Sequence, residues 1–206
     1  MSEATTSRRR PPRRPTVGVI SCPSCGRPVK LDSNWCPACS FSGVDCLALF
    51  PGEPPPLLPI LDATGILTES DQVQITGACA ALKKRFPQFQ WRICAVSLPP
   101  EANLSLFGFW LLNACPLAAK ETADERAWTV LLLINSGTGQ AAAVPGYAAE
   151  PFLSDDEWKS ILSAMTAVWR QGKAGDAVIR FFTEMRNQLE RAWKRFGARK
   201  HHEPNP

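Results

Sequence analysis

The chain has 206 residues, of which 45% are hydrophobic and 20% are charged. This composition is typical of a globular protein with one domain of medium size and a small additional module. Its net charge of +4 is carried by residues 1–16, where five arginines outnumber the single glutamate. The remainder of the chain has as many acidic as basic residues, which excludes a protein that binds nucleic acid over a generally basic body.

Residues 1–16 consist mainly of Ser, Thr, Arg and Pro, and such a composition predicts a disordered arm. Two roles remain open for the arm. It is either a solvated tail that aids solubility or a contact for phosphates or acidic lipids, so nucleic acid is one candidate partner. The arginines are followed by prolines and cysteines instead of an apolar run. We therefore expect no secretory signal and a cytoplasmic protein.

Four cysteines follow the arm in two Cys-Pro-x-Cys turns, formed by Cys22 with Cys25 and by Cys36 with Cys39. This spacing predicts four thiolates around one Zn²⁺ in a closed, structural site. Residues 17–49 then resemble a zinc ribbon, a class that binds nucleic acid, binds protein or only fastens a terminus. A segment of this size needs the metal to supply its folding energy. The other cysteines are predicted to be small apolar side chains: Cys46, Cys79, Cys94 and Cys115.

A proline-rich linker is predicted over residues 50–59, and the main domain over 60–197, before a disordered tail at 198–206. Thr68 and Asp71 predict a helix start, and Pro87 its end. Residues 90–98 alternate as in a strand. Asn103 can cap a helix through Asn113 that is apolar nearly all round, so that helix is either deeply buried or covered by a partner.

The stretch 102–119 has no charged residue, and its length is at the lower limit of what could span a bilayer. It contains Asn103, Asn113 and the helix breaker Pro116. A buried helix is therefore expected there, and no membrane span.

The central part of the chain predicts a hairpin. Residues 130–134 have no polar side chain and predict a strand buried on both faces, and 141–144 predict a returning strand after a Gly-containing turn. Ser154 and Glu157 form a capping box for a helix with an apolar stripe, and a last helix follows Gly175. This order of helices and strands predicts a layered α/β domain with a mixed sheet.

The side chains restrict the chemistry of the domain. The sequence contains two histidines, His201 and His202, which excludes Ser-His-Asp triads and His-ligated catalytic metals from the folded body. Carboxylates remain, and four of them precede or begin helices: Asp62, Glu150, Asp155 and Asp156. Such groups could bind Ca²⁺ or Mg²⁺ and activate a phosphate ester. They could equally be turn caps and first-turn residues of helices.

Three short motifs carry a family resemblance: Asp62-x-x-Gly65-x-Leu67, Gly146-Tyr147-x-x-Glu150-x-x-Leu153-x-Asp155 and Trp169-Arg170-x-Gly172. In order and spacing, residues 60 to about 188 resemble the TPM domain family of thylakoid-lumen acid phosphatases, photosystem II repair proteins and bacterial relatives. The resemblance implies a Rossmann-like α/β sandwich and, in some members, divalent-cation binding and phosphatase activity. It also implies that Asp62, Glu150 and Asp155 are the acidic loop residues at the site.

Two classes of function follow from these observations. In the first, the domain binds a divalent cation and hydrolyses a phosphate ester. In the second, it is a non-catalytic module that binds another protein, helped by the helix at 104–112, or that associates with nucleic acid through the arm and ribbon. Carboxylates that converge in space would favour the first class. We favour a binding role because the folded body has no general base other than a carboxylate.

Overall fold

The computed structural model describes residues 19–30, 32–50, 52–117 and 121–200, without the side chains of 196–200. The predicted arm at 1–16 lies outside these ranges, as does the tail beyond residue 200. The elements in chain order are β1 (Val19–Ser21), β2 (Pro28–Lys30), α1 (Gly43–Leu49), β3 (Ile60–Asp62), α2 (Glu69–Arg85), β4 (Gln90–Val96), α3 (Leu104–Ala114), α4 (Ala123–Ala127), β5 (Thr129–Asn135), β6 (Gln140–Pro145), the 3₁₀ turn η1 (Glu150–Phe152), α5 (Asp155–Trp169) and α6 (Ala174–Lys200).

A four-stranded mixed sheet forms the centre of the main domain, in the order β3-β4-β5-β6. The first three strands are parallel and β6 is antiparallel to β5. All seven residues of β5 are buried, as the apolar run in the sequence predicted. The mixed α/β class is therefore confirmed, and β6 lies at one edge of the sheet.

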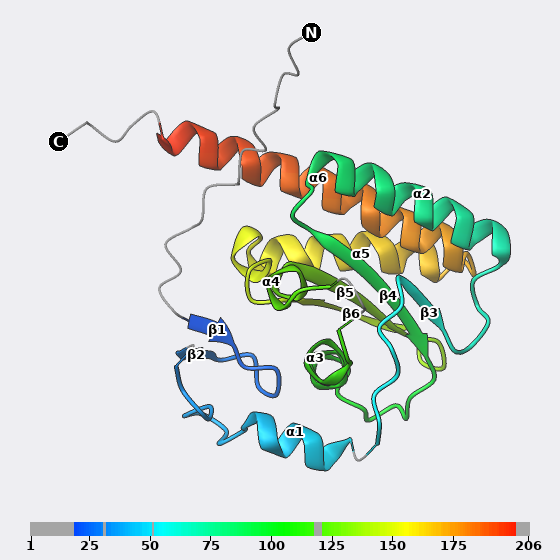
Figure 1. Cartoon of the computed structure of the whole chain (residues 1–206). Coiled ribbons are helices and arrows are strands. Elements are labelled where there is room, and N and C mark those ends of the chain that lie inside the picture. The colour runs from blue at the N-terminus through cyan, green and yellow to red at the C-terminus, as the bar shows by residue number, and fades with distance from the viewer. Residues whose placement is uncertain (1–18, 31, 51, 118–120, 201–206) are drawn as a thin grey trace, which may run out of the picture.

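Helices cover both faces of this sheet (Figure 1). On one face, α2, α5 and α6 pack over Ile93 of β4 and Leu132 of β5 in a large core. On the other face, α3 packs over Cys94, Leu131 and Leu133. Alternate residues of the central strands thus point into two separate cores, which explains why β5 has no polar face.

The N-terminal segment covers the outer side of α3 (Figure 1). The ring of Phe41 lies 6.2 Å from that of Phe109, and the ring of Phe50 lies 5.4 Å from that of Phe107. Cys46 of α1 is only 2% exposed, and its Sγ lies 4.0 Å from the carbonyl oxygen of Leu106. The apolar helix predicted at 104–113 is therefore covered by the protein's own N-terminal module, which leaves less of it for another protein.

The segment predicted as a linker is also packed. Leu57 is buried in the same core as α3, and the ring of Phe50 lies 5.2 Å from the indole of Trp110. Phe50 and Leu57 of this segment therefore fasten the N-terminal module along α3.

Three short elements were not expected from the sequence: α1, α4 and β3. Both helices begin with capping boxes, Ser42 with Asp45 and Thr122 with Glu125, so a local signal was present. β3 has three residues after a run of prolines, and among the described strands it pairs with β4 alone. It is a strand because β4 offers it hydrogen bonds, which the local sequence does not reveal.

Candidate functional site

The four predicted zinc ligands lie in two turns of the same conformation. In the first, Gly26 N donates to Cys22 O at 2.8 Å, and in the second Ser40 N donates to Cys36 O at 2.8 Å. Gly26 and Ser40 both have positive φ angles, 71° and 60°. Each turn thereby directs both of its cysteines to one side.

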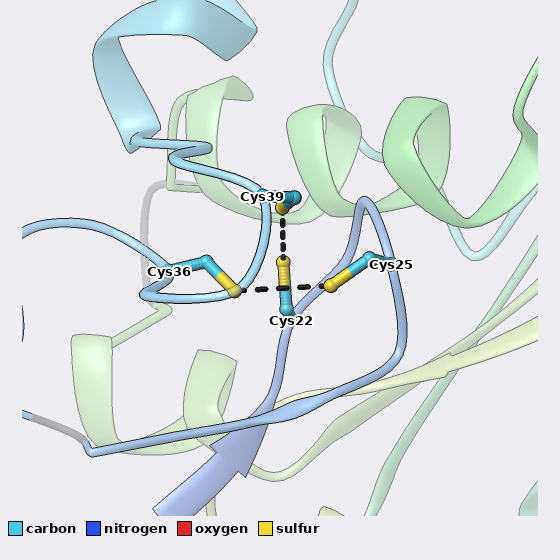
Figure 2. A group of neighbouring side chains, drawn as sticks. All are labelled: Cys22, Cys25, Cys36 and Cys39. Atoms are coloured by element: carbon cyan, nitrogen blue, oxygen red, sulfur yellow. Dashed lines mark hydrogen bonds between the residues drawn. The ribbon is translucent and has the colours of Figure 1, made fainter.

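The geometry of the four sulfurs fits one tetrahedral metal ion. All four Sγ atoms lie within 4.8 Å of one another, and they point to a common centre (Figure 2). Sγ of Cys22 and Cys39 are 3.8 Å apart, and those of Cys25 and Cys36 are 3.7 Å apart. A tetrahedron with Zn–S bonds of about 2.3 Å has sulfurs about 3.8 Å apart. The cysteines can therefore hold one metal ion such as zinc.

Hydrogen bonds favour the thiolate at one of the four cysteines. Burial would raise the pKa of Cys36, but hydrogen bonds from the amides of Ala38 and Cys39 and from the side chains of Cys39 and Cys22 outweigh burial and lower that pKa to about 7. Burial raises the pKa of Cys22 to about 12. Four thiolates this close would repel one another, and a bound cation would offset that repulsion.

Glu150 attaches the ribbon to the main domain. Its Oε1 accepts a hydrogen bond from the amide of Ser21 in β1 at 2.9 Å. Glu150 is held in turn by its own amide, which donates to Gly146 O at 2.9 Å. A Cβ at Gly146 would lie 2.5 Å from the carbonyl oxygen of Ala127, so this tight approach needs glycine. A weaker contact of 3.5 Å joins Asn103 Nδ2 to Ser24 O.

A pocket of about 400 Å³ lies where the ribbon meets the main domain. Its walls come from the first cysteine turn, α3, β6, η1 and α5, and include Ser24, Phe109, Glu150, Asp155, Trp158 and Lys159. A second pocket of about 330 Å³, between α3 and α4, shares Phe109, Val144, Pro145 and Tyr147 with the first. The two pockets therefore adjoin along the end of β6.

Asp62 lies elsewhere. Its carboxylate accepts hydrogen bonds of 2.8–3.0 Å from the amides of Thr64, Gly65 and Leu67 and from the Thr64 hydroxyl. Burial opposes these bonds, but together they lower the pKa of Asp62. The carboxylate thus holds the loop between β3 and α2.

The strand register separates Asp62 from the other two predicted carboxylates. Asp62 is level with Ile134 of β5, whereas β6 returns the chain to the level of Val130 before Glu150 is reached. The structure therefore brings Glu150 and Asp155 to one pocket and leaves Asp62 at the opposite end of the sheet. Within the described ranges, the group of three or more potential ligands close enough to share a metal is the four cysteines. A cation site at Asp62, Glu150 and Asp155 stays a prediction.

A family model described as the TPM domain matches residues 60–188, which is more than half of the chain. The chain belongs to the TPM domain family. The match begins at β3 and ends within α6, so it covers the sheet and the helices on both of its faces. The four predicted zinc ligands and α1 precede the matched TPM domain.

Three solved structures are similar to this chain at low identity. They are the N-terminal domain of protein cg2496 from Corynebacterium glutamicum (14% identity, TM-score 0.48, 61% of this chain and 76% of that one), BA42 from Bizionia argentinensis (14%, 0.47, 64% and 86%) and the N-terminal domain of a P. gingivalis protein (15%, 0.49, 78% and 94%). No curated protein matches the chain.

Arg126 of the TPM domain is not among the residues that the sequence predicted to be functional, yet its side chain connects several segments of the chain. Its guanidinium donates to the carbonyls of Leu112 in the last turn of α3 and of Cys115 and Pro116 just after it, and pairs with Glu121 at 2.7 Å. It closes the end of α3 beside the second pocket. No local pattern predicts this role, because the partners become neighbours only in the fold.

The other pocket residues missed in the sequence have the same explanation. Trp158, Lys159 and Phe109 come from helices on opposite faces of the TPM domain. Their shared pocket could not be inferred without the sheet order and the position of the ribbon. Every helix within the described ranges is too short or too polar to pass through a lipid bilayer.

Proposed function

We propose that the protein is a non-catalytic, protein-binding module in which a structural Zn²⁺ holds the N-terminal ribbon against the TPM domain. The observation that carries the proposal is the pocket of about 400 Å³, because the ribbon and the TPM domain both line it. A surface shared by two modules exists only while they are docked, so the metal would maintain the binding surface.

Zinc has a clear structural task in this proposal. The core of the ribbon has three buried residues, Cys22, Val29 and Cys36. So small a core cannot offset the chain entropy lost on folding. Four cysteine ligands leave no open position for substrate or water, so the metal stabilises the fold and does not perform chemistry.

A metal-dependent phosphatase has less support. Asp62 is separated from Glu150 and Asp155 by the length of the strands, and its oxygens accept four hydrogen bonds from its own loop. The carboxylate of Glu150 accepts a hydrogen bond from the amide of Ser21. A cation site would need these carboxylates to leave their present partners.

Photo-crosslinking in cells tests the binding proposal. A photoreactive amino acid replaces Tyr147, which is 40% exposed and lines both pockets, or Val73, which is 73% exposed on α2. We expect a discrete protein adduct from position 147 that is lost when Cys36→Ser removes a zinc ligand. Position 73 is the control and should give no such adduct. The same adducts from both positions, or none from 147, would contradict the proposal.

Calorimetric titration of the zinc-loaded chain with Ca²⁺ and Mg²⁺ tests the alternative. We expect no saturable binding, and no hydrolysis of a generic phosphate ester above the rate without protein. Saturable binding that is lost in Asp62→Asn and in Asp155→Asn would favour the cation-dependent hydrolase instead. Binding of nucleic acid by the arm stays a separate prediction, because the arm lies outside the described residues.

A further inference from the structure

We propose that the outer edge of β6 binds an extended segment of a partner protein as an additional strand, with a lysine or arginine of that segment beside Glu150 and Asp155. The inference rests on the proposed binding function and names its mode and the chemistry of its partner.

The hydrogen-bond alternation of β6 leaves an unpaired edge. Gly146 N donates to Thr129 O at 2.7 Å, which makes Thr129 and Gly146 a hydrogen-bonded pair in the antiparallel register. Such pairs alternate with non-bonded ones. Ala141 and Ala143 therefore stand opposite Ile134 and Leu132 in non-bonded positions, with their amides and carbonyls directed away from β5. Within the described residues, no backbone hydrogen bond to these outward groups is present.

The pocket at the ribbon lies against this edge. Ala143, Val144 and Pro145 of β6 line it, and the side chains of Ala143 and Val144 pack into the two different cores. The groove is thus bounded by α5 on one side and by α3 on the other, with the first cysteine turn beside them. A strand laid along β6 would place alternate side chains against these two walls.

Both walls offer apolar contacts to such a segment. Trp158 and Leu162 of α5 line one side and Phe109 of α3 the other. Aromatic and aliphatic surfaces that flank an open strand edge are the arrangement that peptide-binding domains use when main-chain bonds give affinity and side-chain pockets give specificity.

The charge of the groove selects the partner. Glu150 and Asp155 are two carboxylates in its lining, and Lys159 is its one cationic side chain among the described lining residues. The net negative charge favours a basic segment and disfavours an acidic one. A second copy of this chain pairing edge to edge would bring the same carboxylates together, so a separate basic partner fits better.

The test uses the full, zinc-loaded, isotope-labelled chain and two synthetic probe peptides. Both are ten residues of alternating valine and threonine; one carries a central arginine and the other a central glutamate. We expect the arginine peptide to bind saturably, to shift the amide signals of Ala141 and Ala143 and to slow their exchange by about tenfold near saturation. The glutamate peptide should bind at least about threefold more weakly.

Matched variants separate the charge from the edge. Asp155→Asn should weaken the binding of the arginine peptide by about twofold to fivefold, whereas Glu69→Gln, in the exposed first turn of α2, should not. Ala143→Pro removes the outward amide donor and should weaken it by about threefold to tenfold. If that variant fails to fold, the exchange of the Ala143 amide in the unaltered chain still decides the question.

Several results would overturn the inference. Absence of binding by the arginine peptide would do so, as would binding that shifts amides elsewhere and leaves Ala143 unchanged. If the amide of Ala143 is already protected from exchange in the free protein, another segment occupies the edge. That segment belongs to a second copy if the protection grows with protein concentration, and to residues 1–16 if their removal abolishes the protection. A crosslinked partner at Tyr147 together with an unprotected Ala143 would leave the binding function standing and reject strand addition.

Discussion

Two different roles can be assigned to the carboxylate of Asp62. Its position in the family motif implies a role at a site, and its four hydrogen bonds give it the role of a loop cap. Carboxylates that accept several amide bonds are strongly stabilised in the ionised form. The same side chain therefore contributes to the stability of the loop before α2, whatever else it does.

Asp62→Asn should destabilise the protein by about 1–3 kcal/mol, because an amide replaces an ionised acceptor of backbone bonds. The pKa of Asp62 is lowered in the folded protein. Its contribution is therefore fully present above the unfolded value of about 3.9 and is lost as the pH falls through the folded value. Urea unfolding at pH 7 and pH 3 should show a smaller pH dependence for the variant. Asp156→Asn is the control, with 95% of that side chain exposed, and should change stability by less than about 0.5 kcal/mol.

Ser40 is a second residue whose backbone conformation has a measurable effect. Its φ of 60° is the counterpart of Gly26 at 71° in the other cysteine turn, and a side chain at such an angle is strained. Ser40→Gly should tighten zinc binding by about twofold to fivefold, corresponding to about 0.5–1 kcal/mol. Competition with a colorimetric chelator would measure this. Ser40→Ala retains the strain and should show no gain; an equal gain in both variants would reject the explanation.

At the scale of elements, α3 approaches the sheet closely at a glycine. A Cβ on Gly108 would lie 2.6 Å from Cγ2 of Val144 in β6, whereas Gly77 in α2 is exposed, and a Cβ added there would meet no atom within 4 Å. Both glycines are inside helices, so alanine at either site gains the same helix propensity. The difference between the two substitutions therefore reports the packing of α3 on β6.

Gly108→Ala should lower the free energy of unfolding by about 1–3 kcal/mol, because the added methyl overlaps a β-branched side chain with few alternative rotamers. Gly77→Ala should raise it by about 0.5–1 kcal/mol. Thermal and urea unfolding of the two variants would measure both effects. Stabilisation by both would mean that α3 is not held tightly against β6.

The elements that the sequence predicted are those with local signals. Capping boxes at Thr68 and Ser154, and a side-chain cap at Asn103, begin α2, α5 and α3 where the sequence placed them. The two cysteine turns were predicted from their local Cys-Pro-x-Cys spacing. Other features depend on contacts between residues that are far apart in the chain, separated by 60 positions for Cys46 and Leu106 and by 129 for Ser21 and Glu150. These features are the order of the strands, the packing of α1 on α3 and the pocket. The spacing of residues along the chain carries no information about such contacts. For this reason the sequence suggested one site for Asp62 and Glu150, which the strand register places at opposite ends of the sheet.

At the scale of the whole molecule, metal removal should uncover one face and leave the other intact. The N-terminal module covers α3, while α2, α5 and α6 form a separate core on the other side of the sheet. A strong chelator should release one Zn²⁺ per chain, increase binding of an apolar dye and change the fluorescence of Trp110, with most helical circular dichroism retained.

Two cysteine variants check this prediction. Cys36→Ser should reproduce the effect of the chelator without any treatment. Cys79→Ser is the matched control, because Cys79 lies on α2 in the opposite core, and it should retain one Zn²⁺. If α3 stays covered after complete loss of the metal, the contacts between the N-terminal module and α3 are sufficient to keep the two together. The proposal that zinc maintains this contact would then be wrong.

The position of the ribbon also has a consequence for synthesis on the ribosome. Its four ligands lie within residues 22–39, so the metal can close the ribbon soon after this segment emerges. Its docking residues on α3 come about sixty positions later, as the separation of Cys46 and Leu106 shows, and Glu150 comes later still. Phe41 and Phe50, which pack on α3 in the finished protein, therefore lack this contact while the rest is translated, although Phe41 also packs against the core of the ribbon. If the ribbon binds zinc as proposed, we expect it to close before α3 arrives to bury these rings.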